Sequence, residues 1–505
     1  MDIGTLIPRH AQYRPDHTAI VFDGNRLTYA AFNQRINKLA NALLAGGITK
    51  GQMVATVMPN CQELLDIYWA AAKTGIVVVP MSPLLQPKGL AKLLNDADAV
   101  MVFVHPNYAP LVDASRDGLD IPSDKIVLTG EDHSDRFRRY EDFVSDAPSD
   151  DPTDAALSDD DIYNIIYSSG TTGDPKGIVH THYVRANYCT MFSQAFRMSP
   201  ESILLQTGAA IFNGAFVLSL PLFNNGGTYI LHEAFDMDRV IETLRDEGVT
   251  HIMMVPAQII QLIDHPELDP DDLKSLECVL SLGAPLHLEH KKRFDALLPG
   301  RFYELYGLTE GFMTILDKND FPQKPESVGT CPLFLEMRIR DDNGSNLPAN
   351  EIGEIVGRGP HLMPGYYKRP ELTAEAIKEG WLYSGDLGYM DEDGFLYLVD
   401  RKKEMIISGG VNVYPRDIED VAVAHPDVSE VAVFGLPDEK WGETPICAVV
   451  LKTDASVAEE TLKDWINANV AAKFQRASRV LIMDDFPRNA AGKTLKRAIR
   501  DGLLP

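Results

Sequence analysis

Cysteine is scarce in this sequence, and the few cysteines are far apart. Five occur in 505 residues, at positions 61, 189, 278, 331 and 447. No pair has the short spacing that is typical of metal ligands. We therefore expect reduced, buried thiols in a cytoplasmic protein, with no site built on cysteine.

Long apolar runs are also absent. No run reaches the length that spans a bilayer, so we expect no integral membrane segment. The first sixteen residues, MDIGTLIPRHAQYRPD, lack the basic region followed by an apolar stretch that a secretory signal needs. The hydrophobic fraction of 45% and the charged fraction of 24% are those of a globular protein.

Positive charge is in deficit. The 47 Lys and Arg residues face 73 Asp and Glu residues, which gives a formal net charge of −26. This balance argues against a nucleic-acid-binding protein, which would carry a basic face. An anionic ligand would need local positive groups to attract it against the overall field. Such groups gather at the C-terminal end, at Lys473, Arg476, Arg479, Arg488, Lys493, Lys496, Arg497 and Arg500. They form either a solvated helix face or a positive lid over phosphates.

The chain is too long for one ordinary core, so at least two domains are expected. Thr28 predicts a helix start, Gly46 and Gly47 its end, and residues 53–58 and 76–79 read as buried strands around an amphipathic helix at 63–73. This alternation predicts an α/β fold with a parallel sheet covered by helices. The Asp-rich residues 141–161 read as a solvated loop.

A second break occurs at residues 400–403, a charged turn after an apolar run at 395–399. Beyond it we predict a helix near 416–425, strands near 428–434 and 446–451, and a helix near 457–470. These elements suffice for a small α+β domain.

The strongest local motif is YSSGTTGDPKG at residues 167–177, which follows a predicted strand. Its glycines let the backbone approach a polyphosphate and point N–H groups toward it, while its hydroxyls and Lys176 add donors and charge. It is not a Walker A loop, because the spacing before Lys176 differs and no Ser or Thr follows it. The segment ending in Gly492-Lys493-Thr494 also fails that test, because Pro487 stands where a glycine is needed.

Four more segments accompany this loop: YELYGLTE at 303–310, WLYSGD at 381–386, DRKKEMIISGG at 400–410 and PRNAAGK at 487–493. Together, in this order, they resemble the adenylate-forming superfamily of acyl-CoA synthetases, luciferases and peptide-synthetase adenylation domains. The resemblance extends from Leu27 to Lys493. It implies a large N-terminal domain of layered sheets with helices (1–399), a hinge (400–403) and a small, mobile α+β C-terminal domain (404–505).

The resemblance also implies an ATP site. The phosphate loop would hold the β- and γ-phosphates, Tyr306 would stack on adenine beside Gly307, and Thr309 would contact the α-phosphate. Asp386 would accept from the ribose hydroxyls, where a carboxylate is a strong acceptor, and Arg401 would bind ribose or phosphate. Ser168 and Glu310 match positions that contact Mg²⁺, a cation that prefers oxygen ligands. The remaining expected ATP residues are Ser169, Gly170, Thr171, Thr172, Gly173, Lys176, Gly283, Ala284 and Pro285.

By the same resemblance, Lys493 would bridge the attacking carboxylate and the α-phosphate, where a cation stabilises the developing charge. Lys403 matches the hinge position about which the C-terminal domain rotates after adenylation. That rotation would withdraw Lys493 and bring Ser408, Gly409 and Gly410 to the site as a narrow tunnel for the pantetheine arm of CoA.

The chain departs from the family pattern at its predicted acyl pocket. Many relatives have an aromatic–histidine pair where this sequence has Phe212-Asn213, and Asn213 cannot titrate. Leu282 stands where many acid ligases have glycine, so it is expected to fill part of the pocket. The predicted pocket residues are Phe212, Asn213, Phe216, Leu282, Phe312 and Met313. They include no Lys or Arg to pair a second carboxylate, which favours a monocarboxylic acid with an apolar aliphatic or aromatic body.

The function indicated is that of an acid–CoA ligase that uses ATP, Mg²⁺ and CoA and releases AMP and pyrophosphate. A stand-alone adenylating enzyme that loads a carrier protein is the alternative. Luciferase-like oxygen chemistry has no support in the residues, and an inactive nucleotide-binding protein is disfavoured by the intact set Lys493, Glu310 and Asp386. A homodimer is compatible with the sequence.

Overall fold

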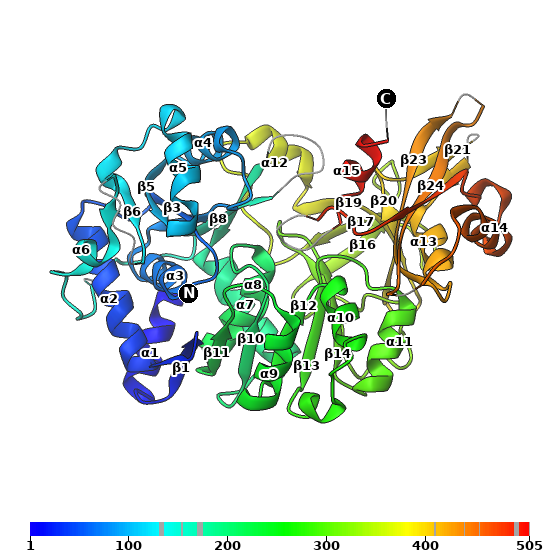
Figure 1. The fold of residues 1–505 in the computed structure, drawn as a ribbon. Coiled ribbons are helices and arrows are strands. Elements are labelled where there is room, and N and C mark those ends of the chain that lie inside the picture. The colour runs from blue at the N-terminus through cyan, green and yellow to red at the C-terminus, as the bar shows by residue number, and fades with distance from the viewer. Residues whose placement is uncertain are drawn as a thin grey trace.

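The computed structural model describes residues 1–130, 136–152, 155–168, 175–408, 411–438, 440–453, 455–488 and 494–503. Within these residues the chain forms a large N-terminal part of mixed α/β structure and a small C-terminal part (Figure 1). The strands of the described residues make four sheets. Among the same residues no helix is long and apolar enough to cross a membrane, and all five cysteines are unpaired.

The first sheet has seven strands and contains the predicted parallel pair. The buried strand β3 (Met53–Val57) pairs in parallel with β4 (Val77–Pro80) and β5 (Ala99–Val104). Strand β4 also pairs in parallel with β8 (Ile162–Ser168), which precedes most of the predicted phosphate-binding motif at 167–177. In spatial order the strands are β7 (Arg138–Arg139), β6 (Ile126–Leu128), β5 (Ala99–Val104), β3 (Met53–Val57), β4 (Val77–Pro80), β8 (Ile162–Ser168) and β9 (Lys176–Thr181).

The second sheet has eight strands, mostly parallel, and lies at the centre of the molecule in Figure 1. The order is β15 (Met313–Leu316), β14 (Phe302–Gly307), β13 (Cys278–Leu282), β12 (His251–Met254), β10 (Ile203–Gln206), β11 (Thr228–Leu231), β1 (Thr18–Phe22) and β2 (Asn25–Thr28). The carboxyl ends of β10, β12, β13 and β14 are therefore neighbours at one edge, the place where open α/β sheets bind ligands.

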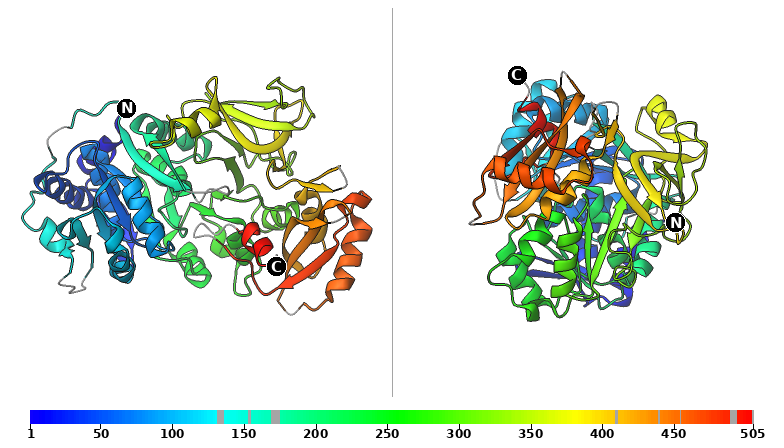
Figure 2. Two further views of the ribbon diagram at one scale, coloured as in Figure 1. Left: turned by 90° about the horizontal axis from the view of Figure 1, so that it is seen from above. Right: turned by 90° about the vertical axis from the view of Figure 1, so that its right-hand side faces the viewer.

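Two smaller antiparallel or mixed sheets follow along the chain and lie apart from the first two (Figure 2). The third sheet comprises β16 (Glu336–Arg340), β17 (Gly353–Arg358), β18 (Ile377–Lys378), β19 (Trp381–Met390) and β20 (Leu396–Arg401). The fourth comprises β21 (Ile406–Ser408), β22 (Val411–Val413), β23 (Val428–Asp438), β24 (Gly442–Leu451) and β25 (Arg479–Met483). The predicted strands of the C-terminal domain are part of this fourth sheet.

Helices cover and separate the sheets. The α-helices of the described residues are α1 (Leu6–Tyr13), α2 (Tyr29–Ala45), α3 (Gln62–Thr74), α4 (Pro87–Asp96), α5 (Ala109–Ser115), α6 (Tyr140–Val144), α7 (His182–Ala195), α8 (Asn213–Asn225), α9 (Met237–Glu247), α10 (Pro256–Ile263), α11 (Leu288–Leu297), α12 (Pro370–Ala376), α13 (Pro415–Val423), α14 (Glu459–Asn469) and α15 (Lys496–Asp501). One continuous core cluster joins α2, α3, α7 and α8 to strands of both large sheets.

The predicted cap of α2 is confirmed, because the Thr28 hydroxyl accepts a hydrogen bond from the backbone N–H of Ala31 at 3.2 Å. The expectation that the next helix is amphipathic was wrong. Helix α3 is buried on nearly all sides, because it packs against α2 and places Trp69 on Phe223 of α8, with ring centroids 5.2 Å apart. Its buried Asp66 is compensated by Arg35 of α2, with Nη2 2.6 Å from the carboxylate.

Candidate active site

A continuous cavity of about 1980 Å³, lined by described residues, opens at the carboxyl edge of the eight-stranded sheet and extends to the third sheet and the C-terminal part. It is larger than the usual 300–1,000 Å³ of a small-molecule site, so it has room for a nucleotide and a second ligand together. The predicted site residues among its lining are Lys176, Phe212, Asn213, Leu282, Gly283, Ala284, Pro285, Tyr306, Gly307, Thr309, Glu310, Met313, Asp386, Arg401 and Lys403.

The ends of the parallel strands explain how residues far apart in sequence meet there. Strand β13 ends at Leu282, and the turn that follows uses Gly283 in the left-handed region with φ +92°. Strand β14 ends at Gly307, two residues before Thr309 and three before Glu310. Helix α8 begins at Asn213, on the connection that leaves β10.

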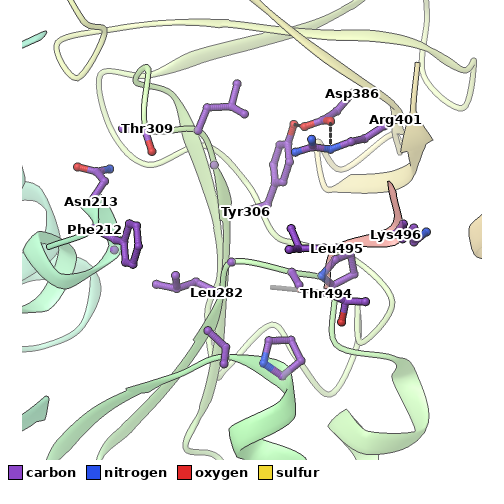
Figure 3. A pocket seen from close by; sticks show the side chains of 18 of the residues that line it. Phe212, Asn213, Leu282, Tyr306, Thr309, Asp386, Arg401, Thr494, Leu495 and Lys496 are labelled. Carbon is purple, nitrogen blue, oxygen red and sulfur yellow. Dashed lines mark hydrogen bonds and ion pairs between the residues drawn. The ribbon is translucent and has the colours of Figure 1, made fainter. Parts of the chain in front are cut away.

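Asp386, Tyr306 and Arg401 form a compact polar cluster on one side of the cavity (Figure 3). The Tyr306 hydroxyl donates to Asp386 Oδ2 at 2.7 Å, and Arg401 Nε lies 3.4 Å from Asp386 Oδ1. The register of β19 and β20 places Asp386 opposite Arg401. Burial, followed by the neighbouring carboxylate, raises the pKa of Tyr306, so the phenol stays protonated and keeps donating. A carboxylate has about four acceptor positions, so Asp386 retains capacity for the hydroxyls of a ribose.

Glu310 and Thr309 are held by two residues that the sequence did not single out. The Tyr366 hydroxyl donates to Glu310 Oε1 at 2.9 Å, and Lys176 Nζ lies 4.8 Å from the centre of the Tyr366 ring. His180 Nε2 lies 2.8 Å from the carbonyl oxygen of Thr309. Burial lowers the pKa of His180 well below its ordinary value, so the ring is neutral and donates from Nε2 to that carbonyl.

The expected acyl end of the cavity is lined by Phe212, Asn213, Leu282 and Met313. Leu282 closes on Gly214, where a Cβ atom would lie 3.1 Å from Leu282 Cδ1. Asn213 is hydrogen-bonded from behind by Arg185 and to Tyr188, neither of which the sequence predicted. A basic residue, Arg185, therefore does lie next to the expected acyl end, in contact with Asn213 but not itself lining the cavity.

Two predicted pocket residues, Phe216 and Phe312, do not line this cavity. Phe216 is one turn deeper in α8 than Asn213 and packs in the core against Tyr68, with ring centroids 5.3 Å apart. Phe312 is fully buried beneath Gly357 of β17, where a Cβ atom would lie 2.1 Å from the ring. The position of a residue in the sequence does not reveal on which side of the backbone its ring packs.

Several predicted residues lie outside the described residues: Ser169, Gly170, Thr171, Thr172, Gly173, Gly409, Gly410 and Lys493, together with the side chain of Ser168. Arg488 and Thr494, which flank residues 489–493, both line the cavity. Ser408 is buried in β21 and does not line it, whereas Lys403 is exposed in the turn after β20 and does.

The C-terminal part meets the rest of the chain through polar contacts near this turn. His287, directly before α11, lies 2.7 Å from Asp420 of α13. Asp400 Oδ2 accepts from the backbone N–H of Arg416 at 3.2 Å, and Arg416 Nη1 donates to the carbonyl of Leu398 at 3.1 Å.

Asp400 gives this junction a dependence on pH. Burial raises its pKa from the ordinary 3.8 to about 6, against the opposing effect of Lys496 and with Glu419 adding to the rise. A raised carboxyl pKa means that the folded state binds the proton more tightly than the unfolded state does. The contribution of protonated Asp400 to the free energy of unfolding is therefore complete below pH 3.8 and is lost as the pH rises through about 6.

We expect Asp400→Asn to remove that dependence. The thermal midpoint of the wild type relative to the variant should decline between about pH 4 and pH 6. Differential scanning fluorimetry over this range measures the difference. A difference that stays the same across this pH range, whatever its size, contradicts the raised pKa.

Comparison with known proteins decides the family. The sequence profile of the AMP-binding enzymes matches residues 7–367, and that of the AMP-binding enzyme C-terminal domain matches residues 417–493. The chain belongs to the AMP-binding enzyme family. The predicted resemblance and the predicted fold class, a large α/β N-terminal domain with a small C-terminal one, are thereby confirmed.

Among AMP-binding enzymes, this one is 34% identical over 506 residues to a feruloyl-CoA synthase from an Amycolatopsis species, covering 99% of this chain and 98% of that protein. It is equally 34% identical to the long-chain-fatty-acid–CoA ligase FadD13 of Mycobacterium tuberculosis, again with 99% and 98% covered. The crystal structure of ATP-bound MatB from Rhodopseudomonas palustris superposes with a TM-score of 0.90 and 28% identity, covering 99% of both chains.

Proposed function

We propose that this AMP-binding enzyme is an acid–CoA ligase, which converts a monocarboxylic acid, ATP and CoA into an acyl-CoA, AMP and pyrophosphate. The observation that carries the proposal is a large cavity, lined by described residues, in which the predicted ribose, adenine and α-phosphate residues meet an apolar acyl end. Relatives of the same length that are named as acid–CoA ligases support it. The cytoplasmic location and a homodimer stay predictions.

In this proposal each residue acts through its position in the cavity. Tyr306 stacks on adenine while its hydroxyl fixes Asp386 for the ribose, and Arg401 adds a positive charge beside it. Thr309 binds the α-phosphate, held in place by His180 through its carbonyl. Lys493 brings a cation to the carboxylate and the α-phosphate, two anions that must approach each other for the bond to form.

Mg²⁺ is expected to join the phosphates at Glu310. The carboxylate Oε1 already accepts from Tyr366, which fixes its orientation toward the cavity. In the part of the chain that is described, no group of three or more His, Cys, Asp or Glu side chains could hold a metal ion. A single carboxylate still fits Mg²⁺, which is usually held by one or two carboxylates, substrate phosphates and water. When bound, the ion neutralises phosphate charge.

The domain division 1–399, 400–403 and 404–505 belongs to the same proposal. Lys403 is the hinge, about which the C-terminal domain turns after adenylation to bring Ser408, Gly409 and Gly410 to the cavity. Its exposed position in a turn between the third and fourth sheets suits a residue that changes its backbone angles.

The test is a panel of acids incubated with the protein, ATP and Mg²⁺, with and without CoA. Pyrophosphate release and hydroxamate formation report adenylation, and mass spectrometry reports the thioester. We expect acid-dependent pyrophosphate release and a CoA thioester. Release without any CoA thioester would contradict CoA as the acceptor and favour loading of a carrier protein. No release with any acid would overturn adenylation itself.

The size of the acyl group is expected to depend on Leu282. Its side chain closes on Gly214 and narrows the apolar end of the cavity. Leu282→Gly should raise kcat/KM for a bulky acid relative to a small one by about tenfold, because one extra methylene already matters that much in a tight pocket. Gly214→Ala narrows the same gap and should shift the ratio in the opposite direction. If both variants keep the wild-type ratio, this gap does not contact the acid.

A further inference from the structure

Arg185 is a fully buried cation without an acidic partner among the described residues. It lies on α7 with 0% of its surface exposed. Its Nε donates to Asn164 Oδ1 at 3.1 Å and its Nη1 to Asn213 Oδ1 at 2.8 Å, while Nη2 has no hydrogen-bond partner in the described part of the chain. Since arginine stays protonated in proteins and buried charges are normally paired, this arrangement has a cost that calls for a function.

The surroundings of the guanidinium do not supply negative charge. It lies over the rings of Phe216 and Tyr188, 4.4 and 5.0 Å from their centres. Burial lowers the pKa of His180 well below its ordinary value and that of His361 to about 4, so both histidines are neutral near pH 7. The positive field of Arg185 is therefore directed at its hydrogen-bonded neighbours.

Asn213 is the neighbour that reaches the cavity. Its Oδ1 accepts from Arg185, so Nδ2 must point the other way, because two donors would otherwise face each other. Nδ2 donates one hydrogen to the Tyr188 hydroxyl at 3.2 Å. An amide has two N–H groups, so, counting the described residues, one remains for a ligand in the cavity that Asn213 lines. That ligand must be a hydrogen-bond acceptor, and the charge behind the amide favours an anion.

The position of Asn213 indicates which acceptor this is. Figure 3 shows Asn213 and Thr309 on the same side of the cavity, away from Asp386 and Arg401. Asn164, which binds Arg185, lies opposite His180 in the register of β8 and β9, and His180 binds the carbonyl of Thr309. The remaining N–H therefore lies on the same side of the cavity as Thr309, the expected α-phosphate residue (Figure 3). The proposed function places the reacting carboxylate on that side.

We propose that Arg185 is a positioning residue that orients and polarises Asn213, and that Asn213 donates a hydrogen bond to the carboxylate of the acid and then to the carbonyl oxygen of the acyl-adenylate. This inference rests on the proposed function and specifies how the site holds its acid. In this arrangement a buried arginine and an amide provide the hydrogen bond to the acid, and neither group changes its protonation state to do so.

The test compares Asn213→Asp, Asn213→Ala, Arg185→Met and the Arg185→Met/Asn213→Ala pair in acid-dependent ATP–pyrophosphate exchange without CoA. We expect Asn213→Ala and Arg185→Met each to lower kcat/KM for the acid by about 10–10²-fold, with the KM for ATP nearly unchanged. The double variant should lose little more than either single one, because both changes remove the same hydrogen bond.

Asn213→Asp distinguishes hydrogen-bond donation to the acid from a purely structural role of Asn213, and it leaves the buried arginine in place. Its carboxylate would pair with Arg185 and raise the thermal midpoint, yet it removes the donor and repels the acid, so kcat/KM for the acid should fall at least as far as in Asn213→Ala. Asn164→Asp is the matched control, because it also pairs with Arg185 but leaves the Asn213 donor in place. Its loss of kcat/KM should be smaller.

The inference is overturned if Asn213→Asp keeps the wild-type kcat/KM for the acid. It is also overturned if the variants change the KM for ATP as much as they change kcat/KM for the acid. A preference for dicarboxylic acids that disappears in Arg185→Met overturns it too, because that result would place a second carboxylate at the guanidinium. A wild type that shows no acid-dependent exchange overturns the proposed function, and this inference with it. An active wild type with unaffected variants overturns the inference alone.

Discussion

Replacing Lys493 by alanine is expected to slow acyl-adenylate formation by about 10²–10³-fold, while thioester formation from a supplied acyl-adenylate continues. The first half-reaction brings a carboxylate to a phosphate, and the cation at their meeting point stabilises charge that develops in the transition state. Arg488 and Thr494, the described residues on either side of residues 489–493, both line the cavity. The overall field of this acidic chain, with its formal charge of −26, does not attract the anionic substrates, so the local cation must stabilise them.

The two half-reactions should be measured separately. ATP–pyrophosphate exchange reports the first, and conversion of a synthetic acyl-adenylate by CoA reports the second. Lys473→Ala is a suitable control, because it removes one positive charge from an exposed position that does not line the cavity. It should leave both rates as in the wild type. Equal loss of both half-reactions in Lys493→Ala would contradict the assigned role.

Replacing Asp386 by alanine is expected to raise the KM for ATP by about 10–10²-fold, because hydrogen bonds to a charged acceptor are stronger than neutral ones. Asp386 is only 8% exposed and is held from two sides by Tyr306 and Arg401, so its orientation is fixed before the nucleotide binds. The variant would also leave the Tyr306 hydroxyl without its acceptor.

Exchange kinetics at varied ATP and varied acid give the measurement. The KM for the acid should change little in Asp386→Ala, since Asp386 lies on the opposite side of the cavity from Asn213 (Figure 3). Tyr306→Phe keeps the ring for adenine and removes only the hydroxyl, so it should show a smaller rise in the KM for ATP. An unchanged KM for ATP in Asp386→Ala would remove Asp386 from the nucleotide site.

The sequence predicted well those features that depend on local patterns. The capped helix after Thr28, the parallel strands β3 and β4 and the helix–strand–strand–helix order of the C-terminal part all follow from periodicity and turn residues. Motifs predicted the proposed ATP-binding residues, and those whose side chains the structure describes line one cavity.

What the sequence could not predict depends on contacts between distant elements. Arg185 lies 28 residues before Asn213, on a different helix, and only the packing of α7 against α8 brings them together. Tyr366 and His180 support Glu310 and Thr309 from segments that carry no motif of their own. The rings of Phe216 and Phe312 pack in buried cores, because the sequence alone does not determine which face of the backbone is buried.

The pairing of β19 with β20 has a consequence for the order of events in turnover. Arg401, the last residue of β20, lies opposite Asp386, and the backbone N–H of Lys402 donates to the carbonyl of Gly385 at 2.9 Å. Arg401, which we propose to bind the ribose, and the proposed hinge at Lys403 are thus two residues apart on one β-hairpin. A rotation at Lys403 would pull on this end of the hairpin, so the affinity for AMP and the orientation of the C-terminal domain would change together. Release of the spent nucleotide would then be timed by the same movement that admits the thiol.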